Sequence, residues 1–299
     1  MDYLLIQATN GLVIGIIYAL VAVGVTLIFS ILKIVNFAHG DLYMLGGYTA
    51  YYAITLAGIS PFAAIFVAMI VVFGVGVVLE RLLLTPLYSE RTERKDEYGI
   101  IVTFGLAFFL RNMAIIVFGV FPLKPPSFLE GVQRVGALVV TNDRLFAGIA
   151  GLLLIGALLY FMNGTIWGQA LDAVSQSRDS ASIVGINARR FNSFAFGIGA
   201  ALAAAAGALV APIFSLSPDM GVLPNVQSYV IVILGGMGSV LGSIVAGIVL
   251  GESQALFTAF MPDITRALSY SNAFSMFVLV VLLIVRPTGI FGRRHLRMD

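Results

Sequence analysis

Long apolar runs dominate this chain, and short polar segments separate them. A membrane-spanning helix takes about 20 apolar residues, and most of the runs reach that length. They cover residues 4–32, 42–59, 61–79, 98–121, 145–162, 194–214, 226–251 and 273–285. The pattern predicts an all-α polytopic integral membrane protein with about eight apolar helical segments, built as one transmembrane domain over residues 1–299.

The composition supports this prediction and excludes several classes of function. Hydrophobic residues make up 60% of the chain and charged residues 11%, a balance that soluble domains do not show. The absence of cysteine excludes disulfides, thiolate metal sites and cysteine nucleophiles, and two histidines without clustered carboxylates do not predict a metal site. The net charge of +2 indicates no nucleic-acid partner. No phosphate-binding loop and no catalytic constellation is present, so we expect neither catalysis nor a bound cofactor on this chain.

Basic residues predict the orientation of the chain. Lys and Arg concentrate after residue 79, in the segment 164–192 and in the C-terminal tail, which the positive-inside rule assigns to the cytoplasm. The segments 121–144 and 215–225 are poorer in basic residues and richer in proline, so we assign them to the outside. With these assignments the run 226–251 cannot be one ordinary crossing. It must re-enter the membrane or be a pair of helices broken at the middle.

A glycine cluster marks where that run breaks. The sequence Gly235-Gly236-Met237-Gly238-Ser239, followed by Gly242, contains the residues least able to hold a helix. We predict a half-helix, a turn and a second half-helix near 235–242. Unwound backbone at membrane depth is tolerated where it lines a cavity or is buried in protein, and discontinuous helices hold substrates in many transporters. The candidate residues of a substrate path are Gly235, Gly236, Gly238 and Ser239. The alternative is that these glycines serve only close helix packing.

A second predicted break lies near 36–41, between the first two apolar runs. Asn36, His39 and Asp41 form a compact polar group beside Gly40. Ionisable residues near membrane depth are costly and often functional, so all four are candidates for a gate or a lining of the substrate path. The alternative is a helix-end turn in which Asn36 or Asp41 caps the next helix and His39 bonds to a neighbour.

Arg111 is the one basic side chain well inside a run. It could receive a substrate carboxylate, but we expect it to extend outward to the membrane surface. Small residues at helical spacing also occur in several runs, and they predict closely packed helices, either within the chain or with a second subunit. These sets are Gly11, Gly15 and Ala19; Gly199, Ala203, Gly207 and Ala211; and Gly238, Gly242 and Ala246.

The polar segment 164–192 has an amphipathic pattern. Leu171, Val174, Ala181 and Val184 share one face of a predicted short helix. Ser177 could cap a turn within this element, and Gly185 stands where a left-handed residue would end it. The segment is either a solvated connector or a docking element for a partner. The candidate docking residues are Ala170, Leu171, Asp172, Val174, Asp179, Ala181, Gly185, Ile186 and Arg189.

Three stretches together resemble one known family over residues 11–292. They are Asn36-Phe37-Ala38-His39-Gly40 with Met44, Gly46, Gly47 and Tyr48; Gly185-Ile186-Asn187 leading into 194–207; and Gly235-Gly236-Met237-Gly238-Ser239 ending in Arg286-Pro287-Thr288-Gly289. In order and spacing they are similar to the LivH-type permeases, which are membrane subunits of bacterial ATP-binding-cassette (ABC) importers for branched-chain amino acids. Permeases for urea, amides, aromatic acids and other amino acids are similar.

The resemblance implies the partners and the energy source. A similar but distinct second permease, two cytosolic ATPases that bind ATP and Mg, and a soluble binding protein outside the bacterial inner membrane are expected. The segment 164–192 would insert a coupling helix into the ATPase surface, although Asp172 stands where relatives often carry a basic residue. A stand-alone secondary transporter or channel is the alternative, but the runs contain no chain of acidic residues for ion coupling. A membrane scaffold without transport is a third possibility.

Overall fold

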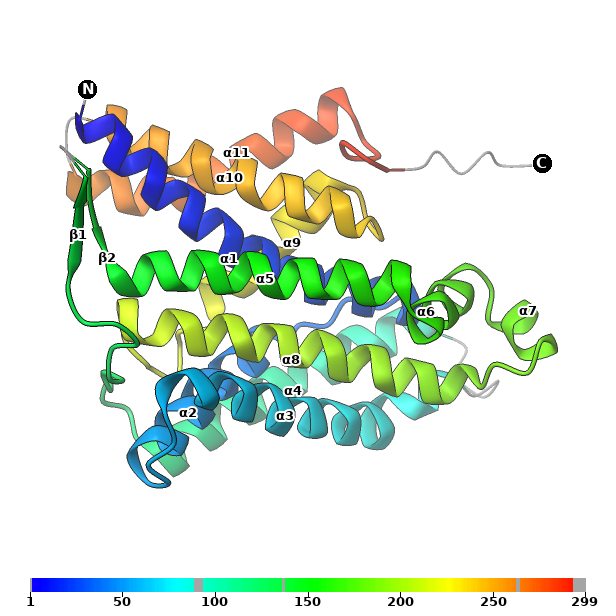
Figure 1. The fold of residues 1–299 in the computed structure, drawn as a ribbon. Coiled ribbons are helices and arrows are strands. Elements are labelled where there is room, and N and C mark those ends of the chain that lie inside the picture. Colours follow the sequence, from blue (N-terminus) through cyan, green and yellow to red (C-terminus); the bar gives the residue numbers. More distant parts are fainter. Residues whose placement is uncertain (1, 89–93, 136–137, 262–263, 293–299) are drawn as a thin grey trace.

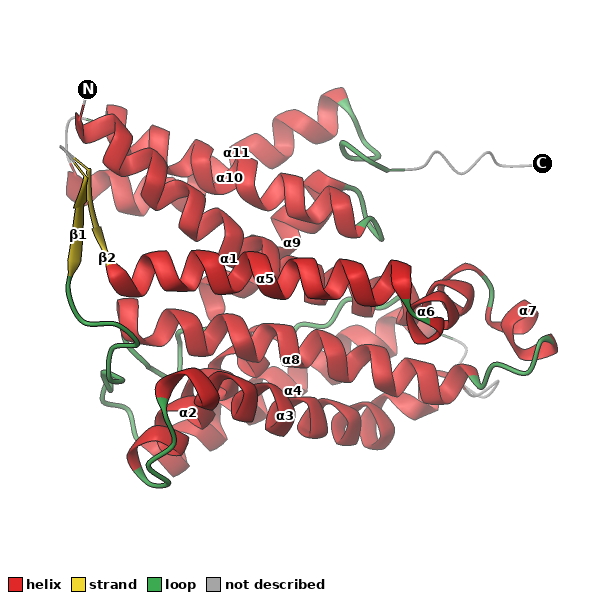
Figure 2. Cartoon of the chain, viewed as in Figure 1, coloured by secondary structure: helices red, strands yellow, loops and turns green. Residues whose placement is uncertain are grey.

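The computed structural model describes residues 2–88, 94–135, 138–261 and 264–292, and helices dominate it (Figures 1 and 2). A π-helical turn, Glu80–Leu84, and a 3-10 turn, Thr85–Tyr88, extend α3. The α-helices are α1 (Asp2–Leu32), α2 (His39–Thr55), α3 (Pro61–Leu79), α4 (Lys95–Phe118), α5 (Asn142–Gly164), α6 (Ile166–Gln176), α7 (Arg178–Ile183), α8 (Ala188–Phe214), α9 (Val222–Gly235), α10 (Val240–Phe260) and α11 (Ile264–Val285).

The molecule has two distinct ends (Figure 1). The N-terminus and an antiparallel hairpin of β1 (Val132–Val135) and β2 (Leu138–Thr141) lie at one end, which we call the hairpin end. The helices α6 and α7 lie at the opposite end with the C-terminal segment, and we call it the α6–α7 end. The segment 164–192 and the C-terminal segment, which we predicted to share one side of a membrane, therefore lie at the same end of the bundle.

The helices α1 and α8 form the centre of the bundle. Six helices are long and apolar enough to cross a membrane, and shorter apolar helices accompany them in the part of the chain that the structure describes. In the spans of α1 and α8, 78% and 89% of the most apolar window is buried, against 28% for α3, α4 and α5. The helix α1 packs on α10, α8 and α9, and α8 packs on α3 and α2. The predicted all-α polytopic membrane fold is confirmed.

Small residues allow these central helices to approach closely. A β carbon added to Gly15 of α1 would lie 3.0 Å from the Gly247 carbonyl oxygen of α10. A β carbon on Gly207 of α8 would lie 1.9 Å from the Tyr43 carbonyl oxygen of α2. The small-residue faces of α1 and α8 therefore form contacts within this chain, which decides between the two alternatives that the sequence left open.

The chain contains two units that run in opposite directions. In each unit a long central helix is followed by a non-helical segment and a short helix: α1, residues 33–38 and α2, then α8, residues 215–221 and α9. Lys33 and Ser215, each directly after the long helix, are the non-glycine residues with positive φ in the described ranges, at 59° and 138°. The first unit starts at the hairpin end and the second at the α6–α7 end (Figure 1).

The predicted break in the run 226–251 is confirmed, because α9 and α10 are separate helices joined at 236–239. We had expected this turn to lie in the middle of the membrane, but the structure places it near one end of the bundle. The amide of Ile290, in the C-terminal segment, donates to the Leu234 carbonyl at 2.8 Å, so the turn lies at the α6–α7 end. The segment that enters the middle of the bundle is 215–221, which we had read as part of a loop. Its local sequence does not reveal this, because its contacts come from residues far away in the chain: Gly221 touches Gly40, and Leu216 exchanges two backbone hydrogen bonds with Leu123.

Replacing Gly207 with alanine should destabilise the protein. The added methyl group would overlap the Tyr43 carbonyl and push α8 from α2, and overpacking of this kind costs about 1–3 kcal/mol. The matched control is Gly156→Ala in α5, where nothing lies within 4 Å of the new β carbon. Thermal unfolding of the purified protein in detergent measures both. Equal midpoints for the two variants would contradict the close packing of α2 on α8.

Candidate functional site

The two non-helical segments meet in the middle of the bundle. Gly40 at the start of α2 and Gly221 just before α9 touch through their backbones: a β carbon on Gly221 would lie 1.9 Å from the Gly40 carbonyl oxygen, and one on Gly40 would lie 2.3 Å from the Gly221 oxygen. Only glycine fits at both positions. The beginnings of two short helices from opposite units therefore lie side by side at this crossing.

Side chains of α9 hold the first non-helical segment in place. The Asn225 amide donates to the Phe37 carbonyl at 2.8 Å, and the Tyr229 hydroxyl donates to the Asn36 carbonyl. The Asn36 side-chain oxygen accepts from the amide of Ala38 at 3.2 Å. Unwound backbone inside a membrane needs such partners, because hydrocarbon offers none. These bonds explain how the segment stays non-helical at depth.

His39 is a packing residue of this crossing. Its side chain is fully buried, and Nε2 lies 3.2 Å from the Val21 carbonyl of α1 in a hydrogen bond. A β carbon on the neighbouring Gly24 would lie 3.0 Å from the imidazole ring, so α1 passes directly over it. This contact matches the structural alternative for His39. A gating role for Asn36, His39 and Gly40 stays a prediction.

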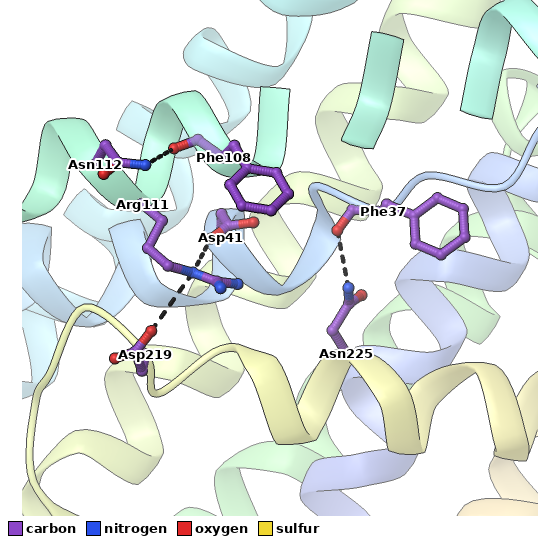
Figure 3. A network of polar contacts seen from close by, with 7 residues as sticks. All are labelled: Phe37, Asp41, Phe108, Arg111, Asn112, Asp219 and Asn225. Atoms are coloured by element: carbon purple, nitrogen blue, oxygen red, sulfur yellow. Dashed lines mark hydrogen bonds and ion pairs between the residues drawn. The ribbon is translucent and has the colours of Figure 1, made fainter. Parts of the chain in front are cut away.

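A cluster of three charges lies beside the crossing (Figure 3). Arg111 of α4 places Nε 3.7 Å from Asp41 Oδ1 in α2 and 3.6 Å from Asp219 Oδ1 in the segment 215–221. The Asp41 side chain is 4% exposed, that of Arg111 30% and that of Asp219 75%. We expected Arg111 to extend outward to the membrane surface, and this stays a prediction; the structure adds that two carboxylates from distant parts of the chain pair with it.

Aromatic rings continue this site along α4. Phe104, Phe108 and Arg111 follow each other at i, i+4 and i+7 and so share one helix face. The rings of Phe104 and Phe108 have centroids 5.0 Å apart, and Phe37 packs edge-on against Phe104 at 6.0 Å. Phe104 and Phe108 are each 53% exposed. The face therefore presents an apolar wall next to a guanidinium and an open carboxylate.

The second candidate group, at 235–239, has a different setting. Gly235 packs on Gly242 of α10, and the Phe291 amide donates to the Gly235 carbonyl at 3.0 Å. Gly236 has φ +99° and is buried against the C-terminal segment, while the Ser239 hydroxyl caps α10 by accepting from the Gly242 amide. The geometry matches the packing alternative for these glycines. Their place in a substrate path stays a prediction.

The segment 164–192 folds as two helices at the α6–α7 end. Ser177 is extended and its hydroxyl accepts from the Ser180 amide, so it caps α7 as predicted and separates α7 from α6. Gly185 has φ +85°, which ends the element as predicted. Leu171 and Val174 are buried as the pattern required. Val184 is not: it is 73% exposed, next to Ile183 at 86%, because the chain turns away after α7.

The other residues of this predicted docking element divide between its two faces. Ala170 and Ala181 are buried, whereas Asp172, Asp179 and Arg189 are exposed and Ile186 is half-buried. The exposed apolar tip at Ile183 and Val184 was not among our candidates. It is the part of the element that a partner could reach first.

Arg178 ties this element to the end of α1. Its Nη2 donates to the carbonyls of Ile31 and Leu32 at 2.8 and 3.3 Å, which are among the last carbonyls of α1 and lack helical partners. A cation at a helix C-terminus is also favoured by the helix dipole. Burial and the nearby Arg178 guanidinium lower the pKa of Lys33 from its usual value. The segment 164–192 thus contacts α1 directly where the first non-helical segment begins.

Comparison with known proteins shows the family. The model of the family described as "branched-chain amino acid transport system / permease component" matches residues 7–285. The chain belongs to this permease family.

Three relatives show how far the similarity extends. The high-affinity branched-chain amino acid transport system permease proteins LivH of Salmonella typhimurium and of Escherichia coli K12 are each 32% identical to this permease over 97% of its chain and 96% of theirs. The corresponding protein BraD of Pseudomonas aeruginosa is 28% identical over 96% of this chain and 95% of its own.

Sequence reasoning missed several residues of this permease that the structure brings together. Asp219, Asn225 and Tyr229 lie in or just after a segment that we read as an external loop, and Arg178 was counted only as a basic residue. A signal existed for Asp219, because it follows Pro218 in a segment bounded by two apolar runs. Its pairing with Arg111 could not be read from the sequence, because no spacing rule connects residues on separate helices.

Removing the Asn225 side chain should loosen the first non-helical segment of the permease. Asn225→Ala leaves the part-buried Phe37 carbonyl without its partner, which costs about 1–3 kcal/mol. We expect faster hydrogen exchange of the backbone amides at 34–41, measured by mass spectrometry. The control is Asn112→Ala, because the Asn112 amide donates to the Phe108 carbonyl of its own helix. Unchanged exchange in Asn225→Ala would show that the bond does not hold the segment.

Proposed function

We propose that this permease is the membrane subunit of an ABC importer and forms the path for a branched-chain or other small amino acid. The family match and the relatives, which are branched-chain amino acid permeases, support the transport system and the substrate class. A urea or amide importer and a stand-alone transporter are the competing functions that the experiment below separates.

One observation carries the proposal: charged side chains lie partly open in the middle of the bundle. By the helical rise, Arg111 lies about 10 Å inside the end of α4 at Phe118, and its side chain is 30% exposed beside the 75% exposed Asp219. Hydrocarbon does not tolerate such groups, so this face meets water or another protein. A water-filled path between this chain and a second, similar permease subunit would give this face contact with both water and protein.

The remaining partners follow from the need for an energy source. The described part of the chain offers no nucleotide-binding loop, so two separate cytosolic ATPases bind ATP and Mg, and an extracytoplasmic binding protein delivers the solute. In this arrangement the α6–α7 end and the C-terminus face the cytoplasm of a bacterium, and the hairpin end with the segment 121–144 faces the outer side of the inner membrane. The basic residues at the α6–α7 end support this orientation.

The helices α6 and α7 form the coupling element in this proposal. Ile183 and Val184 project from its tip and would enter the ATPase surface, while Leu171 and Val174 hold the element on the bundle. Movement of the ATPases would then reach α1 through Arg178 and its bonds to Ile31 and Leu32. The first non-helical segment, which begins at Lys33, follows directly.

Uptake by the reconstituted complex tests the function. Proteoliposomes with the co-encoded permease, ATPases and binding protein should accumulate radioactive leucine only when ATP and the binding protein are present. Accumulation should survive an ionophore that dissipates ion gradients. Collapse of uptake with the gradient would favour a stand-alone transporter, and uptake of urea or amides in place of leucine would favour that substrate class.

Arg178→Ala should uncouple ATP hydrolysis from uptake. The variant loses the cation that binds the last carbonyls of α1, so ATPase movement reaches the spans less efficiently. We expect leucine accumulated per ATP hydrolysed to fall, measured by parallel uptake and phosphate-release assays. The control is Ser182→Ala in the same helix, where the exposed hydroxyl donates to the Arg178 carbonyl one turn earlier. A normal ratio in Arg178→Ala would exclude this route of coupling.

A further inference from the structure

We propose that Arg111 and Asp219 bind the carboxylate and the ammonium of the passing amino acid, while Phe104 and Phe108 contact its side chain. The inference rests on the proposed function and names the place within the path where a zwitterion is recognised. The four residues come from one face of α4 and from the non-helical segment 215–221. Figure 3 shows Phe108, Arg111 and Asp219 together at this place.

Arg111 has hydrogen-bonding capacity that its neighbours do not use. Its Nε lies 3.7 Å from Asp41 and 3.6 Å from Asp219, which balances charge without forming a hydrogen bond. That nitrogen is buried and has no hydrogen-bond partner among the described residues. A guanidinium carries five N–H donors in a planar fork, and a carboxylate accepts two of them in parallel. The carboxylate of an amino acid fits this unmet requirement.

The two carboxylates beside Arg111 differ in accessibility, which separates their roles. Asp41 is 4% exposed and lies in the first turn of α2, so it serves as the fixed internal counterion of Arg111. Asp219 is 75% exposed. When a ligand carboxylate takes its place beside Arg111, Asp219 remains available for the ligand ammonium. One cation and one open anion side by side match the charges of a zwitterion.

The apolar part of the ligand has a matching surface. Phe104 and Phe108 precede Arg111 at the spacing that places them on the same face of α4, and both rings are about half exposed, at 53%. Phe37 lies behind Phe104 with ring centroids 6.0 Å apart. A branched aliphatic side chain next to these rings would be removed from water, which stabilises its binding in proportion to the apolar area buried.

A purely structural ion pair would have a different geometry. Charges that only hold helices together are buried and hydrogen-bonded, because a buried charge without such bonds is costly. In this cluster the buried Nε of Arg111 has no hydrogen-bond partner among the described residues, and Asp219 is largely open. The buried amide nitrogen of Asn36 and the buried side-chain oxygen of Asn225, close to the same segment, also lack partners in the described residues. Unused polar capacity and an open apolar wall together indicate a ligand.

The test uses the complete importer in proteoliposomes, supplied with binding protein and radioactive leucine or valine. Arg111→Gln and Asp219→Asn should each lower the initial rate of leucine uptake about tenfold or more, since each removes a charge-assisted contact. Arg111→Lys, which keeps the charge and loses the planar fork, should fall between Arg111→Gln and wild type. Copurification of all subunits confirms that each variant assembles.

The leucine-to-valine uptake ratio is a measurement that would not change if these residues had only a structural role. Phe108→Ala should lower the leucine-to-valine uptake ratio about threefold, since one methylene in an apolar site contributes an effect of this order or larger. The matched control is Phe109→Ala, because Phe109 is 58% exposed but lies on another face of α4. This control should keep the wild-type ratio.

The possible outcomes separate this inference from the proposed function. A wild-type complex that does not take up leucine would overturn the function itself. Leucine uptake by wild type that persists in Arg111→Gln would overturn only the carboxylate contact. Loss of uptake in Arg111→Gln with an unchanged leucine-to-valine ratio in Phe108→Ala would show that the cluster stabilises the fold and does not contact the transported amino acid.

Discussion

The architecture depends on how unwound backbone is satisfied at membrane depth. Two non-helical segments enter the bundle, and their polar groups have no water to bond. The two segments and the helices after them provide each other with contacts. Gly40 and Gly221 touch backbone to backbone, and Asn225 donates to the Phe37 carbonyl across the crossing. The close approach of α1 to α10 and of α8 to α2, also through glycine, brings the crossing to the centre of the molecule.

The same constraint explains why charges gather there. Each non-helical segment is followed by a short helix, and the residues around these helix starts are polar. Asp41 lies in the first turn of α2 and Asp219 just before α9, so the crossing places two carboxylates within reach of one arginine on α4. A cation at that depth needs them, because an unpaired charge in hydrocarbon is costly. Arg111 and Asp219 are the exposed members of this cluster, and we propose that they bind the zwitterion.

A direct chain of contacts connects this centre with the α6–α7 end. Arg178 binds the carbonyls of Ile31 and Leu32, and Lys33 begins the segment that leads to Gly40. The hydrogen bonds of Arg178 and the short covalent stretch 33–40 thus connect the proposed coupling element with the proposed path. Because this stretch is short, few backbone rotations are available to absorb a displacement of α7 before it reaches Gly40.

Much of the design was predictable because it depends on local chemistry. The apolar runs determined that the chain spans a membrane, and the glycine cluster at 235–239 predicted a helix break. Ser177 predicted a cap within the segment 164–192 and Gly185 predicted its end, because caps and breaks act within a few residues. Only the tertiary structure decided which break lies at depth, that His39 packs against α1, and that Arg111 meets Asp219. Those outcomes depend on distances between residues far apart in the chain, and a single sequence specifies such distances only through the packing of the whole fold.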